Sequence, residues 1–287
     1  MNSSTPHKSK GQESKGDSET IAPDASAVQV LMLGCGSMGS ALLTQWRNVD
    51  GFAFTVVSPS GLRQFPDTVT QARSPEDLSG KRFDVIVIGL KPQMIANVLP
   101  DYLEFLAPRG LYLSLAAGFS ITSLMAVTRS RSVARIMPNL PVSLGKGVSG
   151  LYGAEDLNQE HRALINSLMA STGHALWVSG EDALDRVTAI AGSGPGYAFE
   201  FARAWTGAAQ ALGFSEEQSR ALVLKTVQGA VEMALNTDAT LDELRDRVTS
   251  KNGTTHAGLS ALNNDEQLDN LLSNTLQAAY ARAVELR

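Results

Sequence analysis

A glycine turn near the start of the chain is the pattern that most directly indicates chemistry. Gly34, Gly36 and Gly39 are spaced as Gly-x-Gly-x-x-Gly, between an apolar run at 28–33 and a helical stretch at 40–47. In that setting the first glycine permits a tight turn, the second lets the backbone approach a pyrophosphate, and the third lets helix pack on strand. Free N–H groups at the helix N-terminus stabilise the phosphate charge. The turn predicts a dinucleotide site, and a glycine turn without a ligand is the less favoured interpretation.

The end of the second apolar run decides which dinucleotide is expected. An NAD enzyme usually carries an acidic residue there, which binds the ribose hydroxyls. The run 52–57 is followed instead by Ser58 and Ser60, with Arg63 shortly after. Hydroxyls and a guanidinium can bind a 2′-phosphate, and no carboxylate stands there to repel it. The sequence therefore predicts NADPH as the cofactor, with NADH as a weaker one.

A second candidate site is the turn 249–255, which reads TSKNGTT and lies between two helical stretches. Successive backbone N–H groups that open onto a helix N-terminus form a nest suited to a small carboxylate. Because Ser and Thr cap helices routinely, a capped loop that binds nothing is at least as good an interpretation of these residues alone. The cluster 192–196, and Lys91 with Pro92 after the third strand, also stay open between a ligand contact and a simple connector.

The histidines and the cysteine do not add a further site. His7, His161, His174 and His256 are scattered without metal-ligand spacing, so no metal is predicted. We expect His161 to be solvated, and we favour a surface role over acid–base catalysis for His256. The single cysteine, Cys35, excludes an internal disulfide and is interpreted as a packed small residue.

The elements that position these residues alternate along the first part of the chain. Strands are predicted at 28–33, 52–57, 84–89 and 111–115, with weaker candidates at 132–136 and 147–152. Strands that are apolar throughout belong to a parallel sheet covered on both faces. Alternation with helices specifies an open α/β sheet. The sequence therefore predicts a Rossmann-type dinucleotide-binding domain over residues 28–180.

After about Gly180 the strand pattern stops and helical periodicity takes over. Helices are predicted at 182–191, 197–212, 216–236 and 241–248, and from about 265 to the C-terminus. Ser215 with Gln218, and Thr240 with Glu243, are capping-box pairs that mark two helix starts. An all-helical domain over residues 181–287 is therefore expected after the α/β domain.

Composition limits the partners and the location. The 287 residues are 43% hydrophobic and carry a net charge of −5, which disfavours nucleic acid as a partner. No apolar run approaches the length of a membrane span. Residues 1–27 lack the apolar segment of a secretory signal and are predicted to be a disordered tail. With one cysteine and no such signal, the protein is expected in the cytoplasm.

In their order along the chain, these motifs resemble those of the pyrroline-5-carboxylate reductase family, from Val28 to the C-terminus. The segments that carry the resemblance are 33–39, 90–92, 116–118, 137–139, 190–197 and 248–259. The last is the most specific, although Lys251 and Asn252 stand where the family usually has Pro and Gly. Asn tolerates the left-handed conformation better than most residues, so the turn is expected to survive.

The resemblance implies NADPH-dependent reduction of 1-pyrroline-5-carboxylate to L-proline, the last step of proline biosynthesis, by hydride transfer to the C=N bond. It implies a cofactor cleft lined by Leu33, Gly34, Cys35, Gly36, Ser37, Met38, Gly39, Ser58, Ser74, Gly89, Leu90, Lys91, Pro92, Ala116 and Ala117. It implies a substrate site made of Ser250, Lys251, Asn252, Gly253, Thr254, Thr255 and Glu181. Thr255 would lie near the ring nitrogen as the catalytic residue.

The resemblance also implies that the helical domain is a dimerisation domain. It would form an intertwined homodimer, with residues of both subunits in each site, and dimers of the family can assemble further. Three alternatives remain: a reductase of a related cyclic imine, a 3-hydroxyacid dehydrogenase-like NADP enzyme, and a dinucleotide-binding sensor. The dehydrogenase needs a catalytic lysine in its first helical segment, and Lys225 lacks that context. The preserved turn at 253–255 argues against the sensor.

The sequence yields a first prediction, on cofactor preference. In a fluorescence titration of the purified protein, NADPH is expected to bind more tightly than NADH, because the end of the second strand offers hydroxyls in place of a carboxylate. Tighter binding of NADH would contradict it.

Overall fold

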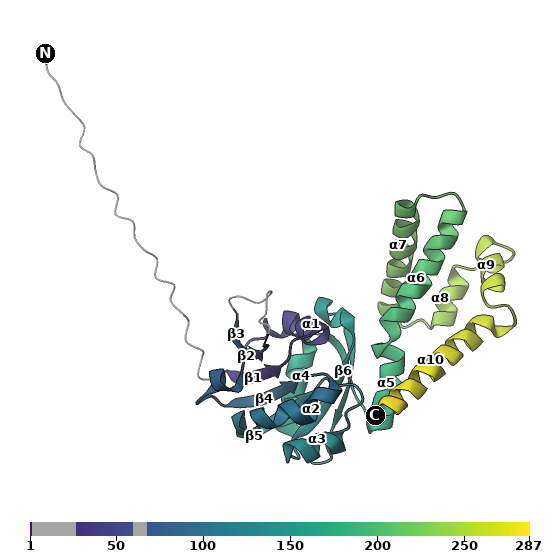
Figure 1. Ribbon diagram of the computed structural model, residues 1–287. Coiled ribbons are helices and arrows are strands. Elements are labelled where there is room, and N and C mark those ends of the chain that lie inside the picture. Colours follow the sequence, from purple (N-terminus) through teal and green to yellow (C-terminus); the bar gives the residue numbers. More distant parts are fainter. Residues whose placement is uncertain (2–26, 60–67) are drawn as a thin grey trace.

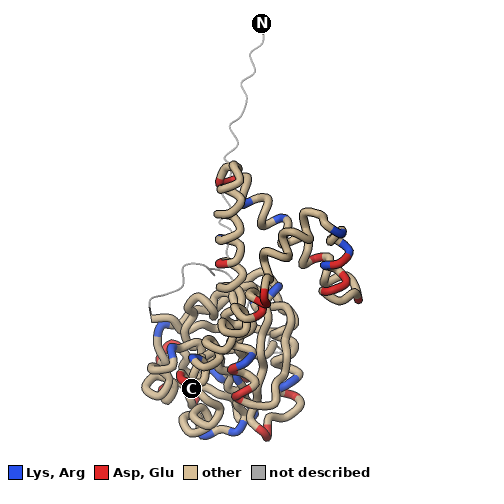
Figure 2. The backbone as a smooth tube through the Cα atoms, turned by 90° about the vertical axis from the view of Figure 1, so that its right-hand side faces the viewer, with Lys and Arg blue, Asp and Glu red and all other residues tan. Residues whose placement is uncertain are grey.

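The computed structural model describes residue 1, residues 27–59 and residues 68–287. Nearly all of the predicted tail, together with Ser60 and Arg63, lies outside the described residues. Figure 1 shows a sheet covered by helices, followed by a group of helices that project from it. Basic and acidic residues are interspersed over both of these described parts (Figure 2).

The described residues of the first part form a sheet of eight strands in the order β3-β2-β1-β4-β5-β6-β7-β8. The strands are β1 (Val28–Leu33), β2 (Phe52–Val57), β3 (Val69–Ala72), β4 (Phe83–Ile88), β5 (Leu106–Ser114), β6 (Val133–Pro138), β7 (Gly147–Gly153) and β8 (Gly173–Trp177). Strands β6 and β7 pair antiparallel, whereas the other neighbouring strands pair parallel. The order reverses between β1 and β4, and ligands of open α/β sheets bind at the carboxyl ends of strands at such a point.

Successive side chains of β1 alternate between two hydrophobic clusters, one on each face of the sheet. Val30 and Met32 face one hydrophobic cluster, which includes residues of α1 (Ser37–Trp46) and α4 (Gln159–Ala170). Leu31 and Leu33 face a second cluster, which includes residues of α2 (Pro92–Val98) and α3 (Ile121–Thr128). Successive strand residues point to opposite faces, so a strand between two layers of helices must be apolar throughout.

All six predicted strands are confirmed, whereas β3 and β8 were missed. Strand β3 is the four-residue segment VTQA, in which the two central residues are exposed. In β8, the segment GHALW, His174 and Leu176 are exposed. Both strands lie at the edges of the sheet, where one side is open and no continuous apolar run is required. Short 3-10 helices η1 (Pro75–Leu78), η2 (Leu99–Phe105) and η3 (Leu140–Leu144) complete this part.

The second part is helical, as predicted. It contains α5 (Glu181–Val187), the π-helix η4 (Thr188–Gly192), α6 (Gly194–Ala211), α7 (Glu216–Leu235), α8 (Leu241–Arg247), α9 (Thr254–Leu262), η5 (Asn264–Glu266) and α10 (Gln267–Leu286). The capping boxes of Ser215 with Gln218 and of Thr240 with Glu243 are confirmed. Figure 1 shows α6 and α7 projecting side by side, and α10 returning to the sheet.

The prediction that His161 is solvated is wrong. His161 is only 7% exposed, and its Nε2 lies 2.9 Å from the carbonyl oxygen of Arg109. In α4 the buried residues are His161, Ile165, Leu168 and Met169. This is the i, i+4, i+7, i+8 spacing of a core-facing stripe, and it carries the imidazole to the sheet.

None of the described helices is both long and apolar enough to cross a membrane.

The ends of β1 and β4 approach so closely that a side chain at Gly89 has no room. A Cβ added there would lie 2.6 Å from the Gly34 carbonyl oxygen, which is backbone and cannot turn away. We expect Gly89→Ala to destabilise the protein by about 1–3 kcal/mol, as overpacking does, and to lower the melting temperature in calorimetry. At Gly36, where nothing lies within 4 Å of an added Cβ, the same substitution should leave melting unchanged. Equal melting of both variants would contradict the tight contact.

Candidate active site

The carboxyl ends of the central strands bring the predicted cofactor residues to one edge of the sheet. The backbone N–H of Gly34 donates to Val57 (3.0 Å), and that of Gly89 donates to Leu33 (2.9 Å). Leu115 N–H donates to Ile88 (3.0 Å). The glycine turn, Ser58, the segment 89–92 and Ala116 with Ala117 therefore follow neighbouring strand ends.

The geometry of the glycine turn matches the role that each glycine has in the motif. Gly34 has φ +80°, and a Cβ there would lie 3.0 Å from the Gly89 carbonyl oxygen. Gly36 is exposed and open, with nothing within 4 Å of an added Cβ. A Cβ on Gly39 would contact the Gly34 carbonyl oxygen and the Met32 sulfur at 3.4 Å. Tight turn, open approach and close helix–strand packing are thus all present.

Helix α1 begins at Ser37 directly behind the open Gly36, and no side chain caps it. Its first N–H groups are therefore available to an anion. The Cys35 thiol beside them is partly buried against the core. That burial raises the pKa of Cys35 to about 11. The thiol stays protonated at neutral pH, consistent with a packing residue rather than a nucleophile.

At the next strand ends, Ser58 and Ser74 lie close together in the fold. The Ser58 N–H donates to Ala72 O at the end of β3 (3.0 Å), and Ser74 is the N-cap of η1. Asp77 accepts from the N–H groups of Arg73 (2.7 Å) and Ser74 (3.3 Å). Arg73 is exposed, and the sequence reasoning did not select it, because β3 itself was missed.

Glu181, a predicted substrate residue, lies at the junction of the two parts. Its Oε1 accepts from the N–H of Ile121 (2.6 Å), and its Oε2 accepts from a terminal nitrogen of Arg135. The other terminal nitrogen of Arg135 donates to Ala116 O (3.1 Å). Arg135 was not selected from the sequence, although an arginine in the apolar segment VARIMP was a signal that a charge is buried there.

The cluster 192–196 is helical rather than an open turn. Ser193 N–H donates to Thr188 O (2.9 Å), five residues back, which is the π-helical bond. Asn139 at the end of β6 donates to Ala191 O (2.9 Å) and accepts from Val148 N–H (2.9 Å). The Asn139 side chain therefore connects the π-helical turn to the sheet.

The predicted substrate turn has the conformation expected of it. Asn252 adopts φ +57°, which confirms that it can take the left-handed position. Gly253 N–H donates to Ser250 O (3.0 Å), and a Cβ at Gly253 would overlap the Ser250 hydroxyl. Helix α9 then begins at Thr254, and no side chain caps it. Thr255 is half-buried and the other side chains of the turn are mostly exposed.

This turn does not reach the cofactor edge of its own chain. Figure 1 shows α8 and α9 standing apart from the sheet. The hydrogen bonds of Thr249 go to Arg245 and Asp246, and Gly253 bonds only Ser250 and Ala257 among the described residues. Within one chain, the predicted cofactor residues and the predicted substrate turn therefore lie apart.

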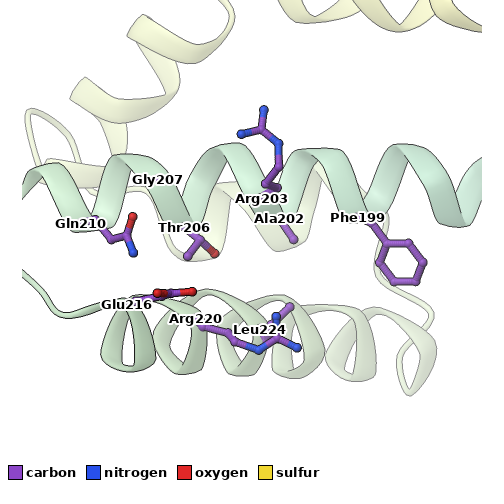
Figure 3. Close-up of a pocket in the computed structure, with 9 residues that line it drawn as sticks. All are labelled: Phe199, Ala202, Arg203, Thr206, Gly207, Gln210, Glu216, Arg220 and Leu224. Atoms are coloured by element: carbon purple, nitrogen blue, oxygen red, sulfur yellow. The ribbon is translucent and has the colours of Figure 1, made fainter.

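The helices that carry the turn present uncovered apolar side chains. Within the described chain, α6, α8, α9 and α10 contain no fully buried residue. Phe199 is 68% exposed and Met233 is 61% exposed. A groove of about 530 Å³ lies between α6 and α7, and its lining includes Phe199 and Leu224. Figure 3 shows these lining side chains on the two facing helices. Apolar surface of this extent marks a protein–protein contact.

No group of three or more potential metal-ligating side chains occurs among the described residues. The sheet with its open glycine turn, followed by a helical domain, has the architecture of two-domain dinucleotide-binding proteins. The family model described as pyrroline-5-carboxylate reductase dimerisation matches residues 181–286.

The pyrroline-5-carboxylate reductase of Pseudomonas aeruginosa is 39% identical over 204 residues, covering 71% of this chain and 74% of the relative. That of Vibrio alginolyticus is 34% identical over 267 residues, covering 90% and 97%. The crystal structure of Plasmodium falciparum pyrroline carboxylate reductase with NADP bound superposes with a TM-score of 0.80 at 27% identity, covering 91% and 98%. The chain belongs to the pyrroline-5-carboxylate reductase family.

The open space at Gly36 yields a prediction that separates binding from folding. A methyl group there meets no protein atom, and φ −72° suits alanine. It would stand where a pyrophosphate must approach, so Gly36→Ala should weaken NADPH binding by about tenfold or more. Fluorescence titration measures the affinity, and calorimetry should show unchanged melting. Full affinity in a folded variant would show that the dinucleotide does not cross Gly36.

Proposed function

We propose that this protein reduces the C=N bond of 1-pyrroline-5-carboxylate with NADPH, giving L-proline. The observation that carries the proposal is the turn 250–255, which keeps an uncapped helix N-terminus and a left-handed Asn252 despite the changes at 251 and 252. The relatives that bear the name of this activity match most of the chain. The cofactor edge supplies the second requirement, an open pyrophosphate turn.

The residues fit a reaction that needs positioning more than acid–base catalysis. When bound, the reduced nicotinamide supplies a hydride to the ring carbon of the C=N bond. The π pair of that bond moves to the nitrogen, and the proton of the iminium form stays there as the amine forms. The N–H groups at the start of α9 and the Lys251 ammonium would hold the substrate carboxylate. The Thr255 hydroxyl would contact the ring nitrogen and fix its orientation.

The proposal includes NADPH as the preferred cofactor. Strand β2 ends at Ser58, without an acidic residue at the position that usually binds ribose hydroxyls. Ser74 and the exposed Arg73 lie beside it at the end of β3. A hydroxyl pair and a guanidinium at one strand edge favour a 2′-phosphate. The NADP named for the Plasmodium falciparum structure supports the same choice.

We also propose that each active site is shared between two copies of the chain. The substrate turn stands apart from its own cofactor edge (Figure 1), and the groove between α6 and α7 is open (Figure 3). A second copy seated on α6 and α7 would cover their apolar faces and bring its own turn to the cofactor edge of the first. An isologous dimer makes two such sites.

The function is tested by NADPH oxidation with 1-pyrroline-5-carboxylate, with a six-membered cyclic imine acid and 3-hydroxyacids with NADP as comparisons. Thr255→Ala should lower kcat/KM for the five-membered imine by roughly tenfold or more, because a hydrogen bond made at the reacting nitrogen is lost. Ser260→Ala removes another hydroxyl of α9, which donates to His256 O (2.9 Å), and should be neutral. No turnover of the imine by the wild type would end the proposal.

The shared site is tested with the same variants. Gly36→Ala damages the cofactor half and Thr255→Ala the substrate half, so a mixed dimer has one intact site only if the halves come from different subunits. Co-expression should then restore about a quarter of wild-type activity, because half of randomly formed dimers are mixed. Activity equal to the mean of the two variants would place both halves in one subunit.

A further inference from the structure

Arg135 is a charged residue inside the sheet. It lies in β6, where every residue is buried, and is itself only 1% exposed. Arginine is almost never fully buried unless it is paired. Its Nε has no hydrogen-bond partner in the described part of the chain, so its charge is compensated through the two terminal nitrogens. Loss of the Glu181 partner would leave an uncompensated charge in the sheet, which is strongly destabilising.

The first of these contacts fixes the backbone after β5. One terminal nitrogen of Arg135 donates to Ala116 O (3.1 Å). The N–H of Ala116 donates to the Ser114 hydroxyl oxygen (3.2 Å). Both backbone groups of Ala116 are thus engaged internally, and Ala116 is buried whereas Ala117 is exposed. The arginine therefore sets where the exposed part of this cofactor-edge segment stands.

The second contact reaches the helical domain. Glu181 is the first residue of α5, and it accepts from Arg135 and from Ile121 N–H at the start of α3. One turn further on, the buried Asp185 pairs with Arg287 of the chain end (3.2 Å). Two arginines and two carboxylates thus alternate across the junction, so removal of one charge leaves the others unbalanced.

We propose that Arg135 is a positioning residue for hydride transfer. It joins the Ala116 carbonyl to Glu181, and so holds the 116–118 backbone in register with the helical domain. This backbone follows β5, which lies on the opposite side of β1 from β2 and Ser58. Because the 2′-phosphate is proposed at Ser58 and the pyrophosphate at the glycine turn of β1, the nicotinamide end would lie toward β5. Glu181 then acts through Arg135 rather than on the substrate directly. The proposal rests on the proposed function for the hydride step, but its effect on cofactor binding is independent of the substrate.

The test compares Arg135→Lys with Arg131→Lys in the full-length protein. Lysine keeps the charge but cannot contact Ala116 O and Glu181 with two separate nitrogens. Arg131 is the matched control, because it pairs with Asp156 on the surface, with its side chain 72% exposed. Two probes are titrated: NADPH, and 2′,5′-ADP, which lacks the nicotinamide.

For Arg135→Lys we expect NADPH affinity to fall by about tenfold with 2′,5′-ADP affinity unchanged, because only the nicotinamide end is displaced. In turnover, kcat should fall, and the primary isotope effect with NADPH deuterated at C4 should increase as hydride transfer becomes slower. Arg131→Lys should resemble the wild type in cofactor affinity and in turnover, including the isotope effect. If Arg135→Lys does not fold, Glu181→Gln carries the same comparison, because it removes the charge that holds Arg135.

Equal losses of NADPH and 2′,5′-ADP affinity would overturn the proposal, since they indicate a general structural defect. Unchanged affinities and an unchanged isotope effect would overturn it as well. If the wild type binds NADPH but does not reduce the imine, the proposed function fails. The two titrations still decide whether Arg135 positions the nicotinamide end.

Discussion

The helices after Gly180 cannot bury enough apolar surface against one another, and the rest of the structure depends on this constraint. Helix α7 has two fully buried residues, Ser219 and Val223, and the other long helices of the described domain have none. The aromatic residues Phe201 and Trp205 of α6 are 48% and 41% exposed. Helix stability in proteins comes mainly from packing an apolar face. These faces need a second surface to cover them, and in the proposed dimer another copy of the chain supplies it.

The sheet domain, in contrast, buries its apolar residues within itself. Its two hydrophobic clusters lie on either side of a single sheet, and the strand ends are joined by short backbone hydrogen bonds. Two side chains then connect the two domains: Arg135 within β6 binds Glu181, and Asn139 directly after β6 binds Ala191 in the π-helical turn. The Arg135–Glu181 contact is a buried ion pair, and removing either partner would leave the other charge uncompensated. These polar contacts accompany apolar packing at the junction, where Leu184 and Val187 of α5 lie close against Gly150 of β7.

The features predicted correctly from the sequence are those that depend on local residue pattern. Apolar strands, capping boxes and the Gly34–Gly36–Gly39 spacing follow from period and residue type, and each occurs where expected. Edge strands β3 and β8 were missed because an edge needs no continuous apolar run. The position of His161 follows from helical phase, which its polar neighbours obscured. The contacts of Arg135 are not local at all: its partners lie 19 and 46 residues away, and only the fold brings them together.

The last turn of α10 lies against the 116–118 backbone, since a Cβ on Gly118 would overlap the Leu286 carbonyl, and Arg287 pairs with Asp185. Tyr280 also bonds Asp182. The helical domain is thus attached at both of its ends, by α5 and by α10, to one small region of the sheet domain. A domain attached through two neighbouring helices is more restricted in its movement than a domain attached through a single linker. Because both attachments meet the segment that follows β5, a shift of the helical domain relative to the sheet would displace that segment.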